Sequence, residues 1–416
     1  MSVTAAKGFV AAGVTAGIKA SGRPDLALVV NQGPDAHAAG VFTSNRFQAA
    51  PVQWSRQALA TPRLAAVVLN SGGANACTGD AGLADARQMA EWTAAEVGCA
   101  VEDVAVCSTG LIGVRLPMET VLNGIQLAAQ DLSGAGGPSA AEAIMTTDTV
   151  AKQAVHESPA GWTIGGMAKG AGMLAPALAT MLVVITTDAV VPSGELDPAL
   201  RTATGFTFDR TDSDGCMSTN DTVLLLASGA SQVTPDPAEF GEALTGVCAS
   251  LARQLLADAE GSAHDIEVRV TGAATEADAL EVARAIARSN LFKCAIFGND
   301  PNWGRVLAAA GTTAAAFEPE QVDVSFNGVD VFVGGQLGAD RSQVSLAGRE
   351  VLVEVNLHAG AESAAIWTND LTYDYVKENA EYSSCPPHEV LLLRCAPPNN
   401  FAGAPRPPMR SPRPRS

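Results

Sequence analysis

Short apolar segments of strand length alternate along this chain with longer segments whose apolar residues recur at helical spacing. Such alternation is typical of layered α/β folds, in which strands are buried beneath helices. The predicted strands are 26–30, 65–73, 104–110, 181–185 and 349–357, and the predicted helices are 80–97, 138–145, 237–257, 275–288 and 370–382. Asp80 is a candidate helix cap, and Asn327-Gly328 predicts a hairpin within 322–333. We expect a mixed α/β fold with several antiparallel pairs and no internal repeat.

Composition narrows the class of protein. The 416 residues suffice for two or three domains or one large layered domain, and 47% of them are apolar. A formal net charge of −18 disfavours binding to nucleic acid or to an anionic membrane surface. No targeting segment is visible, and no apolar run approaches the roughly 18 residues of a membrane span. We expect an enzyme that acts on small metabolites.

Cysteine and histidine usage points to the cytoplasm and away from metals. The eight cysteines are scattered, without a C-x-x-C pair, which favours a reducing compartment. The five histidines show no ligand spacing, so we expect no metal site. Cys107 is a candidate nucleophile by residue type, but no neighbouring histidine supplies a base.

The stretch KGAGMLAPALAT places Thr180 at the head of the apolar segment MLVVI. A threonine hydroxyl becomes a useful nucleophile when a base accepts its proton, and an N-terminal threonine carries that base as its own α-amine. An internal threonine gains the amine only if the preceding peptide bond is cut, through an N→O acyl shift and hydrolysis of the ester. The small Ala179 leaves room for such an attack, and Gly170, Gly172 and Pro176 permit an unusual backbone. The alternative is an ordinary threonine at the start of a strand.

The same stretch resembles the cleavage motif K-G-x-G-M-[IL]-x-P-x-x-A-T-M-L of the ornithine acetyltransferase (ArgJ) family. Other segments resemble the family in the same order and cover essentially all of 1–384. They are GFVAAGVTAGIKASGRPDLALV, VLNSGGANACTG, CSTGLIG, IMTTDT, DSDGCMSTNDT, GNDPNWGRV and ENAEYSS. Several are long and irregular, so the resemblance is specific.

The resemblance implies a fold and a reaction. The expected fold is the DmpA/ArgJ-like layered sandwich of mixed sheets flanked by helices, of the N-terminal-nucleophile type. Cleavage between Ala179 and Thr180 would give an α chain of 1–179 and a β chain of 180–384. Thr180 would take the acetyl group of N2-acetyl-L-ornithine and pass it to L-glutamate, a ping-pong step of arginine biosynthesis. The resemblance leaves open whether acetyl-CoA also serves as donor.

The resemblance also assigns residues to the site. Thr109 and Gly110 match the family's oxyanion pair, a hydroxyl and an open amide able to converge on one oxygen. The substrate-binding positions of the family fall on Thr146, Lys169, Thr180, Glu260, Asn379 and Ser384. A lysine ammonium suits an α-carboxylate, and the Glu260 carboxylate suits the side-chain ammonium of ornithine. By residue type alone, each of these could be an ordinary turn, helix end or solvated charge.

Two departures from the family pattern are visible. The family usually has a lysine four residues after the binding glutamate, whereas this chain has His264, so the local charge and the substrate preference are open to change here. Family members generally end at the equivalent of Ser384, whereas residues 385–416 continue with nine prolines and five arginines. Proline at this density predicts a disordered tail, with a partner-binding segment as the alternative.

Two other functions are compatible with parts of the sequence. An autoprocessing amidohydrolase or aminopeptidase would share the Thr180 chemistry and use water as acceptor. A non-catalytic relative would keep the fold and use its tail for binding. The resemblance favours the acetyltransferase, without metal or organic cofactor. It also favours an α2β2 assembly whose fragments remain associated.

Overall fold

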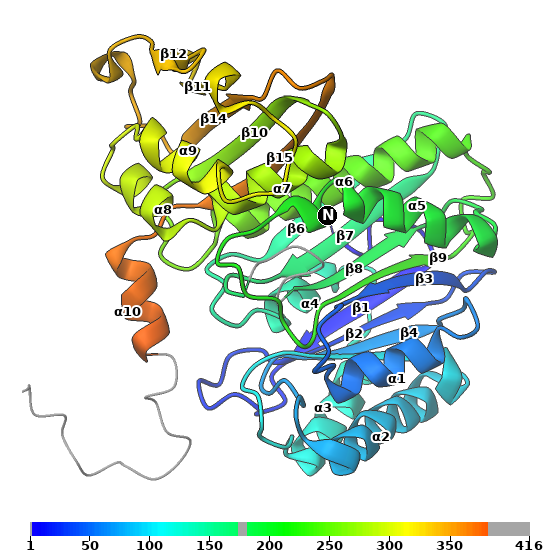
Figure 1. The fold of residues 1–416 in the computed structure, drawn as a ribbon. Helices are drawn as coiled ribbons and strands as arrows, with labels where there is room; N and C mark the ends of the chain where they lie inside the picture. The colour runs from blue at the N-terminus through cyan, green and yellow to red at the C-terminus, as the bar shows by residue number, and fades with distance from the viewer. Residues whose placement is uncertain (1, 174–180, 382–416) are drawn as a thin grey trace, which may run out of the picture.

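The computed structural model describes residues 2–173 and 181–381. Their strands form three sheets, of which two lie face to face in the body of the molecule and the third lies in a separate lobe (Figure 1). The order of layers in the body is helix, sheet, sheet, helix. The predicted mixed α/β layered fold is therefore confirmed.

The first sheet has the strand order β1-β2-β4-β5. Its strands are β1 (Phe9–Val14), β2 (Leu26–Asn31), β4 (Ala66–Asn70) and β5 (Val104–Ser108). The β4–β5 pair is parallel and the other pairs are antiparallel. All residues of β4 and β5 are buried, as their unbroken apolar sequences predict.

The second sheet has the order β3-β9-β8-β7-β6. Its strands are β3 (His37–Phe42), β6 (Lys152–Glu157), β7 (Thr163–Lys169), β8 (Leu182–Thr187) and β9 (Thr222–Ala227). The central strand β8 is the apolar segment predicted after Thr180. It pairs antiparallel with β7 and parallel with β9, so Lys169 lies opposite Leu182.

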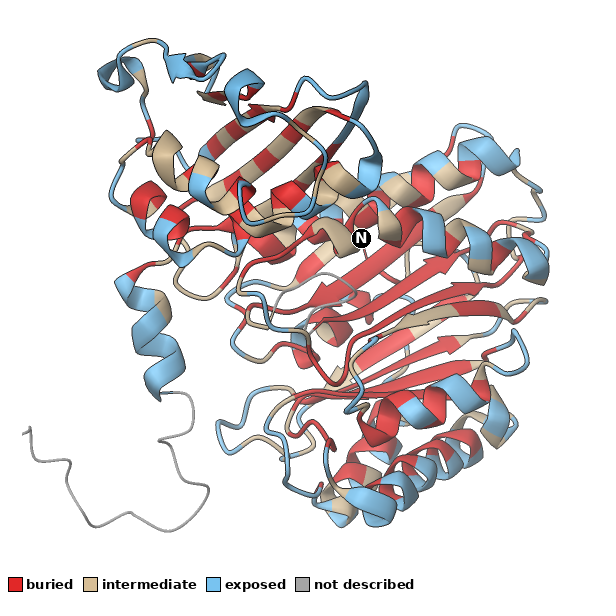
Figure 2. Ribbon diagram, in the orientation of Figure 1, coloured by how far each residue is buried: buried red, intermediate tan, exposed pale blue. Residues whose placement is uncertain are grey.

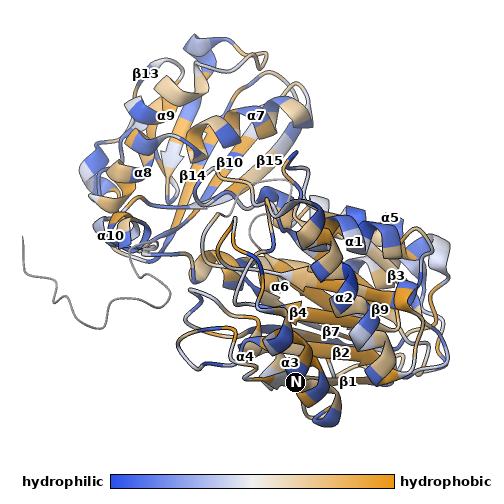
Figure 3. Ribbon diagram, turned by 90° about the horizontal axis from the view of Figure 1, so that it is seen from below, coloured by the Kyte–Doolittle hydropathy of each residue, from blue (hydrophilic) through white to orange (hydrophobic). Residues whose placement is uncertain are grey.

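The two sheets enclose an apolar core. Val29 and Leu69 of the first sheet face this core together with Val184 and Leu224 of the second, and all four side chains are fully buried. Strands β2, β4, β5, β7, β8 and β9 are accordingly largely red in Figure 2, and the strands of the two facing sheets are largely orange in Figure 3. Burial of this continuous apolar surface is the main force that holds the layers together.

Helices cover the outer faces of both sheets. The first sheet is covered by α1 (Ala50–Ala58), α2 (Gly79–Val97) and α3 (Met118–Gln130), and the second by α5 (Ser193–Gly205) and α6 (Pro237–Ala257). The short α4 (Gly137–Ala143) contacts β1 and β2. Helix α6 has the predicted bounds, because the Asp236 carboxylate caps the amides of Ala238 and Glu239 and Pro237 occupies the first turn.

The lobe contains the third sheet, in the order β13-β12-β11-β14-β10-β15. Its strands are β10 (Asp265–Ala273), β11 (Asp323–Phe326), β12 (Val329–Val333), β13 (Gln336–Leu337), β14 (Glu350–Asn356) and β15 (Glu362–Asn369). Its helices are α7 (Glu276–Ala287), α8 (Asn290–Phe297) and α9 (Trp303–Ala310). They share a second apolar core with the sheet. The chain then continues into α10 (Tyr373–Glu381), which projects from the lobe (Figure 1).

Local details differ from the sequence predictions at two helix starts. Asp80 is not the cap of α2, because the N-cap residue is Thr78 and Asp80 lies in the first turn. Helix α9, which was not among the predicted helices, begins at Trp303 with the Asn302 side chain as its cap. The predicted hairpin is confirmed, with both Asn327 and Gly328 at positive φ.

Among the described helices, none is long and apolar enough to cross a membrane.

Candidate functional site

Lys169 is the centre of the candidate site. It is the last residue of β7, and its side chain is almost completely buried. Its ammonium donates to the Thr146 hydroxyl at 2.7 Å and to the Thr109 hydroxyl at 3.3 Å. Three residues that the sequence placed in the site, far apart in the chain, therefore meet at one atom.

The turn after β5 brings Thr109 and Gly110 to this point. Thr109 forms an isolated bridge with Gly73 at the end of the first sheet. Gly110 has φ +133°, and a Cβ added there would lie 2.8 Å from the amide nitrogen of Gly73. A glycine is required here both by the backbone conformation and by the close approach of the neighbouring chain.

A buried chain of charges supports Lys169. The Asp148 carboxylate accepts from the amides of Thr146 at 2.9 Å and of Gly170 at 2.6 Å. It lies 2.6 Å from the Lys152 ammonium and 3.9 Å from that of Lys169. Lys152 in turn lies 2.5 Å from the Asp258 carboxylate. The chain of alternating charges holds the segments on both sides of Lys169.

This arrangement shifts the pKa values of its members in opposite directions. Burial alone would raise the pKa of Asp148, but the positive charges of Lys169 and Lys152 outweigh it and hold that pKa well below its ordinary value. Burial lowers the pKa of Lys169, although the Asp148 carboxylate opposes the shift. Lys169 is therefore a less tightly protonated ammonium than a surface lysine, suited to exchange a proton or to bind an anion.

Glu260 lies beside the glycines that follow Lys169. Its amide donates to Ala171 O at 2.9 Å, and a Cβ added to Gly172 would lie 2.7 Å from its carboxylate. The carboxylate accepts from the Thr147 hydroxyl at 2.8 Å and from the Asn379 side chain at 3.0 Å. Asn379 lies on α10, so this helix is tied to the site through Glu260.

Two cavities share Glu260 in their linings. The first, of about 520 Å³, is lined mainly by acidic and hydroxyl groups, among them Thr147, Asp258, Ser262 and Glu378. The second, of about 290 Å³, carries both signs of charge, with Asp214, Arg288, Lys293 and Asp370 among its residues. Space for a small polar molecule is thus available on both sides of the Glu260 carboxylate.

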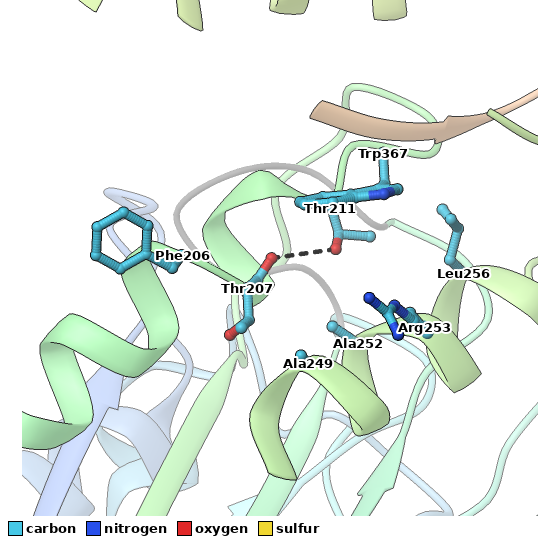
Figure 4. Close-up of a pocket in the computed structure, with 8 residues that line it drawn as sticks. All are labelled: Phe206, Thr207, Thr211, Ala249, Ala252, Arg253, Leu256 and Trp367. Atoms are coloured by element: carbon cyan, nitrogen blue, oxygen red, sulfur yellow. Dashed lines mark hydrogen bonds between the residues drawn. The ribbon is translucent and has the colours of Figure 1, made fainter. Parts of the chain in front are cut away.

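A third cavity lies elsewhere and is small. It has about 40 Å³ between α6 and Trp367 of β15, and the Thr211 hydroxyl donates to Thr207 O on its wall at 3.4 Å (Figure 4). Its walls are largely apolar, and it contains no residue of the Lys169 or Glu260 groups. We assign no chemistry to it.

A buried carboxylate lies at the start of β8. Asp221 Oδ1 accepts from the Met181 amide at 3.1 Å. Asp221 is fully buried, and burial raises its pKa well above the ordinary value. Among the described residues, its Oδ2 has no hydrogen-bond partner. The raised pKa favours the neutral acid, which avoids the cost of burying a charge.

Cys107 does not have the properties of a nucleophile. It lies on β5 with its side chain in the core between the sheets, and burial raises the pKa of its thiol to about 12. The reactive form of a cysteine is the thiolate, which is scarce at such a pKa. Within residues 2–173 and 181–381, no group of three or more His, Cys, Asp or Glu side chains is arranged to hold a metal ion.

His264, the residue at which the sequence departs from the family pattern, contacts Asp370 and Leu346. Its Nδ1 lies 2.7 Å from Asp370 Oδ2, and its Nε2 lies 3.0 Å from Leu346 O. The ring therefore ties the segment after Glu260 to the lobe.

The structure brings together most of the predicted site residues, namely Thr109, Thr146, Lys169, Glu260 and Asn379, with Gly110 directly beside Thr109. Ala179, Thr180 and Ser384 lie outside the described residues. The sequence analysis missed Asp148, Lys152, Asp258 and Asp221. In the sequence, each of them is only a charged residue next to a strand or within a motif. Such a position indicates a role only once the partners of the residue are known.

The layered α/β body thus contains a series of buried ion pairs that ends at a buried lysine, next to polar cavities. Such a site is typical of an enzyme that acts on small polar molecules. The ArgJ family model matches residues 10–384. The chain is 62% identical to the "Arginine biosynthesis bifunctional protein ArgJ" of Streptomyces avermitilis over 384 residues, which are 92% of this chain and all of that protein. The corresponding protein of Thermobifida fusca is 60% identical over the same coverage. This chain belongs to the ArgJ family.

A solved relative is the ornithine acetyltransferase of Mycobacterium tuberculosis in complex with ornithine. It is 56% identical, with a TM-score of 0.42, over 44% of this chain and 96% of that one.

Proposed function

We propose that this enzyme transfers an acetyl group from N2-acetyl-L-ornithine to L-glutamate in arginine biosynthesis. In the proposed scheme, the chain cuts itself between Ala179 and Thr180, and Thr180 then acts as an N-terminal nucleophile. Family membership and the identity to bifunctional ArgJ proteins support the reaction. The residues that carry it out are proposed from their positions in the described structure.

The reaction proceeds in two transfers. The Thr180 hydroxyl attacks the acetyl carbonyl of the donor while its α-amine accepts the hydroxyl proton, and that proton goes to the departing nitrogen of ornithine. The resulting acetyl ester is attacked by the amine of glutamate, and the threonine hydroxyl is restored. An ester transfers an acetyl group more readily than an amide does, which is the advantage of the covalent intermediate.

The observation that carries this proposal is the placement of the Lys169 ammonium. It contacts the hydroxyls of Thr109 and Thr146, and Lys169 pairs with Leu182 in the strand that follows Thr180. The proposed oxyanion donors, the Thr109 hydroxyl and the Gly110 amide, thus lie close to the start of that strand. Negative charge that develops on an acyl oxygen there would meet donors already in place.

The same residues account for recognition of an amino acid. Lys169 and Thr146 offer a cation and a hydroxyl to a substrate α-carboxylate. Glu260 borders both larger cavities and offers a carboxylate to the side-chain ammonium of the ornithine moiety. Asn379 orients Glu260 from α10, and Ser384 is proposed to complete the binding site from outside the described residues.

Further parts of the proposal extend beyond the site. The relatives are named bifunctional proteins, and this supports the proposal that acetyl-CoA is a second donor, used for the synthesis of N-acetylglutamate. We propose no metal or organic cofactor, a cytoplasmic location and an α2β2 assembly of cleaved fragments. Incubation with acetyl-CoA and glutamate, followed by detection of N-acetylglutamate, tests the second donor.

The test of the main proposal is Thr180→Ala, with Thr187→Ala at the end of β8 as a control. Thr180→Ala is expected to give one uncut band in denaturing electrophoresis and no acetyl transfer. Thr187→Ala is expected to give two bands and retained transfer. A cleaved Thr180→Ala protein would contradict the proposal. With labelled acetylornithine, the wild type should form labelled N-acetylglutamate, and release of free acetate alone would instead indicate an amidohydrolase.

A further inference from the structure

The two substrates of the proposed transfer differ in the charge of their side chains. Ornithine ends in an ammonium group, whereas L-glutamate ends in a carboxylate at neutral pH. Both place their α-nitrogen at the same acetyl group, so the two α-carboxylates can share one binding position. The side chains cannot share one, because a carboxylate beside Glu260 would be repelled. The acceptor therefore needs a second pocket that carries positive charge.

Glu260 lies between two cavities that meet this requirement for space. It lines both the cavity of about 520 Å³ and the cavity of about 290 Å³. The Thr147 hydroxyl donates to it at 2.8 Å, and the adjacent Thr146 contacts the Lys169 ammonium. A substrate whose α-carboxylate is held by Lys169 and Thr146 thus has two cavities bordering Glu260 available to its side chain.

The larger cavity has a negative lining. Among the described residues that line it, none is a lysine, an arginine or a histidine. Lys152 compensates the charge of Asp258, which leaves Glu260 and Glu378. Burial and the charges of Glu260 and Asp374 raise the pKa of Glu378, as expected where carboxylates lie close together. This cavity suits an ammonium group and repels a carboxylate.

The two aspartates that line the smaller cavity are largely compensated. The Asp370 carboxylate accepts from the amides of Ala263 and His264 at 2.9 Å each and lies 2.7 Å from His264 Nδ1. Asp214 accepts from the Met173 amide at 2.6 Å, and burial raises its pKa, which favours the neutral acid. A bound carboxylate would therefore meet less repulsion here than in the larger cavity.

Two basic side chains line the smaller cavity, Arg288 at the end of α7 and Lys293 on α8. The Lys293 ammonium is buried and donates to Ser213 O. Arg288 Nε donates to the buried Asp212 carboxylate at 2.6 Å, while 47% of the Arg288 side chain is exposed. This ion pair fixes one edge of the guanidinium, whose terminal nitrogens carry further N–H donors. A guanidinium held in this way is suited to bind a carboxylate through two parallel hydrogen bonds.

We infer that the smaller cavity binds the side-chain carboxylate of L-glutamate and that Arg288 is the residue that selects this acceptor. The larger cavity takes the side-chain ammonium of ornithine. This inference rests on the proposed function, and it explains how one site accepts two amino acids of opposite side-chain charge. Glu260 separates the cavities, because its carboxylate attracts one side chain and repels the other.

Isotope exchange separates the two half-reactions of a ping-pong enzyme. With labelled ornithine and acetylornithine alone, label moves between the two compounds only through the donor half-reaction. With labelled glutamate and N-acetylglutamate alone, label moves only through the acceptor half-reaction. The substrate concentrations that give half-maximal exchange therefore report on the two cavities independently.

The first variant is Arg288→Gln, which keeps a donor for Asp212 and removes the positive charge. It should raise the glutamate concentration for half-maximal exchange by at least about tenfold, because a hydrogen bond to a charged group contributes about that much to binding. Ornithine exchange should not change. The matched control is Arg210→Gln, since Arg210 pairs with Glu276 at 2.5 Å between the body and the same helix α7, and it is not among the residues that line the described cavity. Arg210→Gln should leave both exchanges unchanged.

A second variant decides the matter if Arg288→Gln does not fold. Asn290 is exposed in the first turn of α8 and lines the same cavity. A carboxylate is favourable at a helix N-terminus, so Asn290→Asp should fold. It adds a negative charge to the cavity wall and should raise the half-maximal glutamate concentration about fivefold at low salt, without an effect on ornithine exchange.

Selective weakening of glutamate exchange in Arg288→Gln supports the inference. Equal weakening of both exchanges, weakening of neither, or the same selective effect in Arg210→Gln overturns it. If Arg288→Gln does not fold, unchanged glutamate exchange in Asn290→Asp overturns it as well. A wild-type protein that supports neither exchange contradicts the proposed function itself.

Discussion

The buried chain of charges predicts a large and pH-dependent loss of stability in Lys152→Met. The ammonium of Lys152 lies between the carboxylates of Asp148 and Asp258, which are almost entirely buried. Without it, the nearest remaining ammonium to Asp148 in the described chain is that of Lys169, at 3.9 Å. Removing one partner of a buried pair costs about 3–5 kcal/mol. For a chain of this length, such a loss lowers Tm by roughly 5 °C.

The sign of the pH dependence follows from Asp148. Because its pKa is depressed in the folded protein, the wild type gains stability from it above the ordinary aspartate pKa and loses that stability as the pH falls. In Lys152→Met much of that gain is already absent. The difference in unfolding free energy between variant and wild type should therefore shrink as the pH falls from about 5 to about 2.

Urea unfolding followed by circular dichroism at both pH values measures this difference. Arg201→Met is the matched control, because its ion pair with Asp197 is exposed on α5. It should cost no more than about 0.5 kcal/mol. A Lys152→Met variant that costs as little as Arg201→Met, or whose deficit grows at low pH, would refute the reasoning.

Two further predictions concern the site. Lys169→Met removes the donor to the hydroxyls of Thr109 and Thr146 and should lower the rate of acetyl transfer by about 10²–10³-fold; an unaltered rate in steady-state assays would show that the ammonium is dispensable. Gly172→Ala places a methyl group 2.7 Å from the Glu260 carboxylate and should raise KM for acetylornithine about tenfold, with little change in Tm. An unchanged KM would mean that Glu260 does not bind the donor.

Much of the fold was predictable because local sequence and tertiary environment agree. The apolar segment 181–185 became the central strand β8, and the helix predicted at 237–257 is α6 with the same bounds. Strand β7 was missed, since the pair Gly165-Gly166 weakens strand propensity. The structure explains the first glycine, because a Cβ on Gly165 would lie 2.3 Å from Ser2 O.

The site was predictable in part, and only through motifs. Thr109, Thr146 and Lys169 came from the resemblance, and the structure places their polar atoms together. The pairing of Lys152 with Asp258 joins residues 106 positions apart in the sequence. No periodicity or local spacing reports a contact of that kind, because it depends on how α6 packs on β6 and β7.

The strand order β3-β9-β8-β7-β6 has a consequence for a protein cut before Thr180. The first fragment would supply β3, β7 and β6, and the second would supply β8 and β9, so the two polypeptides interleave within one sheet. Neither fragment contains all the neighbours of its own strands. Refolding of the cut protein would then be a second-order process that slows on dilution, whereas the uncut precursor would refold at a rate independent of concentration.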